Sequence, residues 1–106
     1  MTSEPYEVEL TREAAKDLER LRPWSDQVAR RIRRLEETPY AGHLLTGNLR
    51  GARSLEFSLK GSGVYRAVYF VTEHNRICLV FIICPRENIY DKTERRIEAL
   101  RRSGRI

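Results

Sequence analysis

The sequence predicts one α+β domain over residues 1–106, with an antiparallel sheet of about four strands, a helical hairpin packed on one face, and a C-terminal helix. Three observations support this class. The chain is long enough for a single modest core. Its apolar residues follow a helical period between residues 12 and 38 and return to a strand period afterwards. Short turns separate the last three apolar segments, which favours an antiparallel meander.

The first strand leads directly into the helical hairpin. Apolar residues alternate with glutamates over residues 6–10, which is typical of a strand with one buried face. Thr11 is a candidate N-cap for the first helix and Ser25 for the second, and Pro23 and Pro39 mark the helix ends. Each helix has apolar residues at i, i+4 and i+7, so that one stripe faces the core. The stripes are Ala14, Leu18 and Leu21 in the first helix, and Val28, Ile32 and Leu35 in the second.

The second helix also carries an arginine cluster on its solvated side. Its members are Arg30, Arg31, Arg33 and Arg34. We interpret this cluster as a helix surface balanced by Glu19, Glu36 and Glu37, in preference to a binding surface.

Residues 40–51 contain three glycines and no clear period, so they are expected to form a connecting loop. Strands are then expected over residues 54–59, 64–72 and 76–84, with turns at 60–63 and 73–75. The last strand is almost wholly apolar, as a central strand buried on both faces would be. A capping box beginning at Asp91 starts the final helix, whose Ile97 and Leu100 point inward. The helical hairpin covers one face of this sheet, and we expect the other face to be open.

The composition limits the partners and the location. The chain has 20 basic and 15 acidic residues, and 17 of the basic ones are arginine, which suits bidentate phosphate contacts. A polyanionic partner is compatible with this charge, although charge alone does not decide for one. No apolar run approaches the ~20 residues of a membrane span, and the N-terminus lacks the features of a signal peptide. We therefore expect a cytoplasmic protein with no membrane partner.

The two cysteines fit the same compartment. Cys78 and Cys84 lie six residues apart in one predicted strand, at ~20 Å, which is too far for a disulfide. With only two histidines, the chain makes a poor four-ligand zinc site. We expect reduced, buried thiols and no metal.

Arg66 is the first candidate functional residue. It lies within the strand expected over residues 64–72, on the same side as the apolar residues two positions before and after it. A charge in such a place needs a partner. Two explanations are open: Arg66 pairs with Glu56 on the neighbouring strand, or it lines a cleft and binds an anion.

Arg86 and Tyr90 are the next candidates, since they follow the most apolar strand and precede the last helix. In a structural interpretation, Arg86 pairs with Glu87 or Asp91, and Tyr90 forms a hydrophobic staple at the helix start. In a functional interpretation, both residues belong to the same site as Arg66.

Together these features resemble the RelE/ParE superfamily of bacterial toxins from type II toxin–antitoxin pairs, and the resemblance covers nearly the whole chain. The segments that carry it are the opening strand over 6–10, the paired helices with Ala-Ala-Lys-Asp-Leu-Glu-Arg-Leu, the Thr38-Pro39 stop, Gly47-Asn-Leu-Arg-Gly51, the strand Val64-Tyr-Arg-Ala-Val-Tyr69, and Pro85-Arg86 with Tyr90. The strand containing Tyr-Arg-Ala-Val-Tyr is the most specific of them.

The resemblance implies the RelE-like order β-α-α-β-β-β-α and a toxin function. In the RelE branch this function is ribosome-dependent cleavage of mRNA, which inhibits translation and uses no metal or cofactor. The 2′-OH of a nucleotide attacks the adjacent phosphate. By motif, Tyr90 is the candidate base, while Arg66 and Arg86 are candidates for phosphate stabilisation and protonation. Two guanidinium groups would favour the phenolate of Tyr90 and lower its pKa.

The chain departs from the RelE pattern in one strand, where Glu56 and Ser58 occupy the positions of two expected lysines. Arg53 and Lys60 are nearby and are the candidate substitutes for phosphate binding. The departure leaves two alternatives open. One is a ParE-like inhibitor of DNA gyrase, and the other is a catalytically degenerate homologue that only binds its antitoxin.

The resemblance also implies the partners. They are a cognate antitoxin protein, mRNA on the ribosome, and operator DNA that the toxin–antitoxin complex binds through the antitoxin. The basic last helix, over residues 93–102, and the open sheet face are complementary to an acidic partner.

Overall fold

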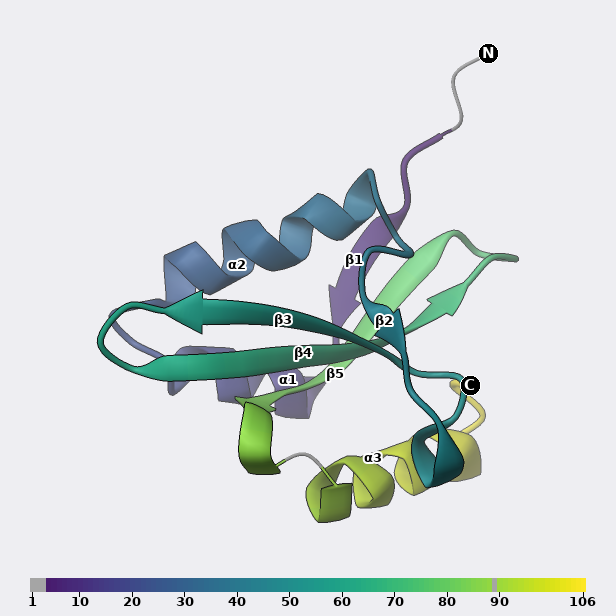
Figure 1. The fold of residues 1–106 in the computed structure, drawn as a ribbon. Coiled ribbons are helices and arrows are strands. Elements are labelled where there is room, and N and C mark those ends of the chain that lie inside the picture. Colours follow the sequence, from purple (N-terminus) through teal and green to yellow (C-terminus); the bar gives the residue numbers. More distant parts are fainter. Residues whose placement is uncertain (1–3, 89) are drawn as a thin grey trace.

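The fold is known from a computed structural model that describes residues 4–88 and 90–106, without the side chains of Asn88 and Tyr90 (Figure 1). Its helices and strands are, in chain order, β1 (Glu7–Leu10), α1 (Arg12–Glu19), α2 (Ser25–Arg33), β2 (His43–Leu44), β3 (Arg53–Leu59), β4 (Gly63–Thr72), β5 (Ile77–Pro85) and α3 (Tyr90–Arg102). Three short 3-10 turns are η1 (Arg34–Glu36), η2 (Gly47–Leu49) and η3 (Arg86–Asn88). The predicted α+β class and the order of the long elements are confirmed.

The five strands form one sheet in the order β1-β5-β4-β3-β2. The meander β3-β4-β5 is antiparallel, as predicted, whereas β1 pairs in parallel with β5. The sheet therefore has one strand more than the predicted number of about four, because two residues of the expected loop pair with β3 as β2. β5 lies between β1 and β4, which explains why its sequence is almost wholly apolar.

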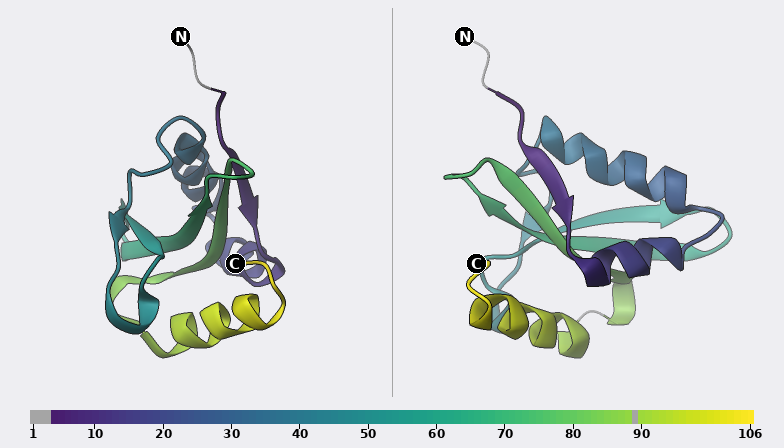
Figure 2. Two further views of the ribbon diagram at one scale, coloured as in Figure 1. Left: turned by 90° about the vertical axis from the view of Figure 1, so that its right-hand side faces the viewer. Right: turned by 180° about the vertical axis from the view of Figure 1, so that it is seen from behind.

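Helices cover both faces of the sheet (Figure 2). α1 and α2 pack on one face, around a core that contains Val28, Ile32, Phe57 and Tyr69. α3 and η2 pack on the other face, around a second core that contains Leu49, Val68, Phe81, Ile97 and Leu100. The prediction that this second face is open is therefore wrong where α3 lies. The inward stripe of α3 needs an apolar partner, and this face of the sheet provides it.

The first helix begins as predicted, and the other two begin differently. The Thr11 Oγ1 accepts from the Ala14 N–H at 3.1 Å and caps α1. Ser25 is not the N-cap of α2, because the helix begins at this residue and its Oγ donates to the Leu18 carbonyl. α3 begins at Tyr90, so Asp91 lies in its first turn, where a negative charge complements the helix dipole.

Cys78 and Cys84 are free and buried, as predicted. Burial raises the pKa of the Cys78 thiol to about 11 and also raises the pKa of Cys84. Within residues 4–88 and 90–106, no helix is long and apolar enough to cross a membrane.

Candidate functional site

Arg66 and Glu56 lie directly opposite each other on the antiparallel pair β3-β4. An Arg66 Nη2 stands 3.2 Å from a Glu56 carboxylate oxygen, and the Arg66 side chain is 16% exposed. The cross-strand ion pair considered in the sequence is thus formed. It gives a charge in the middle of an apolar strand the partner that burial requires.

Arg86 approaches the same carboxylate from another element. It begins η3 at the end of β5, and its Nη1 lies 4.0 Å from the other Glu56 oxygen. The Arg86 side chain is 57% exposed, and no Arg86 ion pair with Glu87 or Asp91 is found in the part of the chain that the structure describes. We call these three residues, Glu56, Arg66 and Arg86, the Glu56 cluster.

The Glu56 cluster lies on the face of the sheet that also carries α3. Arg66 shares its side of β4 with Val68, which belongs to the α3 core, and it stands opposite Cys84 on β5. Burial keeps the Cys84 thiol protonated by raising its pKa, so this thiol does not add a negative charge. The Arg66 Nε is buried and has no hydrogen-bond partner among the described residues.

This geometry can hold an anion. Two guanidinium groups converge on one carboxylate, and guanidinium groups bind phosphate with the same fork of donors. With one negative and two positive charges, the cluster keeps a net positive charge, although Glu56 offsets part of it.

Tyr90 is the predicted base, and its side chain lies outside the described part of the structure. Its backbone begins α3, directly after η3 and Arg86. The role of Tyr90 therefore stays a prediction.

Arg53 and Lys60, the predicted phosphate-binding substitutes, lie at the start of β3 and just after its end. The Arg53 Nη1 donates to the Gly42 carbonyl at 2.8 Å, and its guanidinium lies 4.9 Å from the centre of the Tyr40 ring. Arg53 therefore anchors the segment before β2. Lys60 is exposed in the turn between β3 and β4, beyond the Glu56 cluster.

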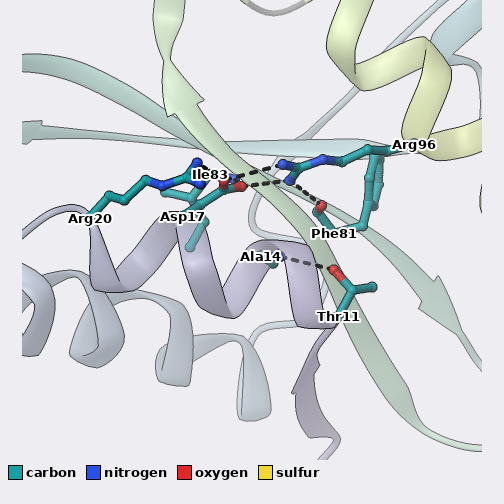
Figure 3. A network of polar contacts seen from close by, with 7 residues as sticks. All are labelled: Thr11, Ala14, Asp17, Arg20, Phe81, Ile83 and Arg96. Carbon is teal, nitrogen blue, oxygen red and sulfur yellow. Dashed lines mark hydrogen bonds and ion pairs between the residues drawn. The ribbon is translucent and has the colours of Figure 1, made fainter.

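A buried ion pair between Asp17 and Arg96 connects the elements around the site, and the sequence did not predict it (Figure 3). β1 ends its pairing opposite Val80, so the edge of β5 beyond that point has no neighbouring strand. Asp17 from α1 accepts from the Ile83 N–H at 3.0 Å, and Arg96 from α3 donates to the Phe81 carbonyl at 2.9 Å. These contacts satisfy backbone groups that would otherwise be buried without partners.

Asp17 and Arg96 also bind each other through two hydrogen bonds of 2.6 and 3.2 Å. The pair joins α1, β5 and α3, and so holds the middle of α3 against β5, whose Cys84 lies opposite Arg66 of the Glu56 cluster. The sequence contained one signal of it. Asp17 lies three residues after Ala14 and four before Leu21, on the buried stripe of α1, where a charge needs a partner.

No three His, Cys, Asp or Glu side chains converge as metal ligands among the residues whose placement the structure describes.

The sequence and the fold are both similar to those of known toxins. The sequence profile of the ParE toxin of the type II toxin–antitoxin system parDE matches residues 8–101. A chain of the RelBE2 toxin–antitoxin complex from Mycobacterium tuberculosis is 25% identical, with a TM-score of 0.65 over 77% of this chain and 99% of that one. No curated protein matches.

Two structures from E. coli show the same fold at lower identity. A mutant of the toxin RelE in the free state superposes with a TM-score of 0.70 and 18% identity, over 91% of this chain and 98% of that chain. A chain of the intact RelBE toxin–antitoxin complex superposes with a TM-score of 0.59 and 22% identity, over 76% of this chain and 95% of that chain.

Proposed function

The chain belongs to the ParE toxin family of type II toxin–antitoxin systems, within the RelE/ParE superfamily, and we propose that it cuts mRNA on the ribosome. The proposed site is the Glu56 cluster together with Tyr90. Cleavage would inhibit translation and would need no metal or cofactor.

The observation that carries the proposal is the convergence of Arg66 and Arg86 on one carboxylate. The two side chains come from β4 and from η3, which are distant in sequence, and they meet around an anionic group. In the proposed complex, a phosphate of the mRNA takes the place of the Glu56 carboxylate. Arg66 is held by the sheet, so its charge is oriented before the substrate binds, which is the condition for electrostatic stabilisation of a transition state.

The proposed reaction moves two protons and exchanges one bond. A base, Tyr90 in this proposal, takes the proton of the 2′-OH, and the 2′-oxygen forms a bond to the adjacent phosphorus. The bond from phosphorus to the 5′-oxygen breaks, and that oxygen takes a proton from an acid, for which Arg86 is the candidate. The products are a 2′,3′-cyclic phosphate and a free 5′-OH. Positioned proton transfer and oriented charge are each typically worth about 10²-fold or more in rate.

A second candidate function is inhibition of DNA gyrase, and two observations favour it. The matching family profile is that of ParE toxins, and Glu56 neutralises Arg66 where the RelE pattern has positive charge. In this function the Glu56 cluster would be a structural ion pair, and no RNA would be cut.

An antitoxin is the proposed partner under either function. A groove of about 330 Å³ lies between the start of α1 and α3, and its lining is mostly basic and apolar, with Thr11 and the acidic Glu13 beside them. Its basic residues are Lys92, Arg95 and Arg96, and its apolar ones are Phe81, Ala99 and Leu100. An acidic amphipathic segment is complementary to such a lining. The first check is whether the neighbouring reading frame encodes a small protein with such a segment, and whether its coexpression restores growth.

The test of the proposed function is expression of the chain under tight control, with the wild type compared with Arg66→Ala and Tyr90→Phe. Growth arrest by the wild type and its loss in both variants support the nuclease. Arrest that persists unchanged in both variants contradicts the assignment of these residues.

The ends of the broken transcripts separate the two candidates. Cleavage leaves a 5′-OH, which cannot be ligated until a kinase has phosphorylated it, and primer extension on a translated mRNA locates the cut. Gyrase inhibition leaves transcripts intact and damages DNA. A harmless wild type would favour the degenerate homologue that only binds its antitoxin.

A further inference from the structure

A second basic surface lies on α2 and η1, in the helical layer on the face of the sheet away from α3 (Figure 2). It is a groove of about 390 Å³ lined by polar and charged residues. The lining residues are Gln27, Arg30, Arg31, Arg33, Arg34, Glu36 and Glu37. We call the four arginines the α2 arginines.

The α2 arginines are not used by the fold. All four are exposed, while the inner stripe of Val28, Ile32 and Leu35 is buried and holds the helix on the sheet. The ion pairs found in the described residues use other arginines, which are Arg20, Arg22, Arg66, Arg86, Arg96, Arg102 and Arg105.

This differs from the sequence-based interpretation of a balanced surface. Glu19, one of the acids expected to balance the cluster, lies 3.8 Å from Arg22 instead. Glu36 and Glu37 line the same groove, and no ion pair within residues 4–88 and 90–106 joins them to the α2 arginines. The groove thus presents four positive charges against two negative ones.

We propose that the α2 arginines bind the phosphate backbone of a folded RNA, and this proposal rests on the proposed cleavage of ribosome-bound mRNA. Charge complementarity supports this occupant. The lining has no apolar side chain to anchor a peptide, in contrast to the groove beside α3. Guanidinium groups suit phosphate, and a helix face with four of them follows a backbone without reading its sequence.

The position of the groove explains why the RNA must be folded. The α2 arginines lie in the layer on one face of the sheet, and the Glu56 cluster lies on the other face. The molecule measures 23 Å along its shortest axis. One short single strand would have to pass around the sheet to reach both, whereas a large folded RNA such as that of the ribosome can contact both faces. The α2 arginines would then anchor the toxin while a different strand occupies the candidate site.

The test is RNA binding by the purified chain, followed by fluorescence anisotropy with a labelled RNA hairpin over a range of salt concentrations. The α2 variant changes Arg30, Arg31, Arg33 and Arg34 to Gln. The control variant changes Arg20, Arg22, Arg102 and Arg105 to Gln, which removes the same charge from arginines that already pair with carboxylates. A third variant changes the α2 arginines to Lys and keeps the charge.

The α2 variant should bind the hairpin about tenfold or more weakly, and the slope of log K against log salt should fall by about 2 or more, since each lost phosphate contact removes about 0.7–0.9. The control and the Lys variant should stay within about threefold of the wild type. Glutamine and lysine both favour helices, and circular dichroism checks that α2 is retained.

Equal weakening in the α2 variant and the control would overturn the proposal, because net charge alone would then explain the binding. Unchanged binding in the α2 variant would overturn it as well. A DNA duplex bound more tightly than the hairpin through the same arginines would contradict the choice of RNA. This binding assay is independent of cleavage. If the α2 arginines bind RNA and the protein does not cut mRNA, the proposed nuclease function fails and the RNA-binding surface stands. If the protein cuts mRNA and the α2 arginines do not bind RNA, the RNA-binding surface fails and the nuclease function stands.

Discussion

At the scale of single residues, Glu56 sets how much positive charge the candidate site presents. Its carboxylate lies within 4.0 Å of both Arg66 and Arg86, and it is one of the two residues that differ in charge from the RelE pattern. The same carboxylate supports the fold, because the Arg66 side chain is mostly buried and needs a partner. One residue therefore links the stability of the sheet to the affinity of the site.

Substitution of Glu56 separates these two effects. Glu56→Gln should raise the affinity for a single-stranded RNA and steepen its salt dependence by about one phosphate contact, because both arginines become available. It should also lower the free energy of unfolding by about 1 kcal/mol, since Arg66 loses its charged partner. Anisotropy and urea unfolding measure the two quantities. Glu87→Gln, which changes an exposed neighbour of Arg86, is the control. If the Glu56→Gln and Glu87→Gln proteins bind RNA with the same affinity, Arg66 and Arg86 do not form the phosphate site.

The buried thiols predict a loss of stability at high pH. Burial raises the pKa of Cys78 from 9.0 to about 11, and burial also raises that of Tyr69. The Cys78 thiol has a higher pKa in the folded state than in the unfolded state, so its contribution to stability is fully present below the unfolded pKa. This contribution is lost as the pH rises from 9 toward 11, where the unfolded chain loses the proton first. The free energy of unfolding should therefore fall over this range, and less steeply in Cys78→Val. Parallel declines in urea unfolding of the two proteins would contradict the role of Cys78.

At the scale of elements, the pair Asp17–Arg96 replaces the strand that β5 lacks beyond β1. Its two side chains are 6% and 15% exposed, and they connect α1 with α3 through the edge of β5. Each element alone is short, so its stability comes from this tertiary connection and from the packing of its apolar stripe.

Removal of Asp17 should therefore be costly. Asp17→Asn should lower the free energy of unfolding by about 3 kcal/mol, because it leaves the Arg96 charge without its partner in a mostly buried place. Glu19→Gln on the same helix removes an exposed pair and should change it by about 0.5 kcal/mol or less. Urea unfolding compares the two. Similar losses in both variants would show that the buried pair contributes no more than a surface one.

At the scale of the whole molecule, local sequence patterns predict the features that depend on residues close together in the chain. The turn over residues 60–62 fixes the register of β3 on β4, and that register places Glu56 opposite Arg66. The parallel pairing of β1 with β5 and the pairing of Asp17 with Arg96 join residues about 70 or more positions apart, and no periodicity encodes such contacts. Arg86 reaches Glu56 through the path of η3, which the sequence between Pro85 and Tyr90 does not specify.

The same limit applies to function. The likeness to toxins lies in the order of the segments, each of which is a local pattern, and the family profile matches residues 8–101. Arg66 and Arg86 both lie within 4.0 Å of the Glu56 carboxylate, and their role in one site stays a prediction. Arg53 contacts Gly42 and Tyr40 instead, since the loop before β2 folds back onto β3.

The most direct test of the central claim is primer extension on one reporter mRNA, with the purified chain added to a cell-free system with and without active translation. We predict new 5′-OH ends within the coding region only when ribosomes translate the message. These ends should persist in the presence of EDTA at a concentration that ribosomes tolerate, and Arg66→Ala should abolish them. Intact transcripts in the presence of a wild-type protein that arrests growth and breaks DNA would contradict the account.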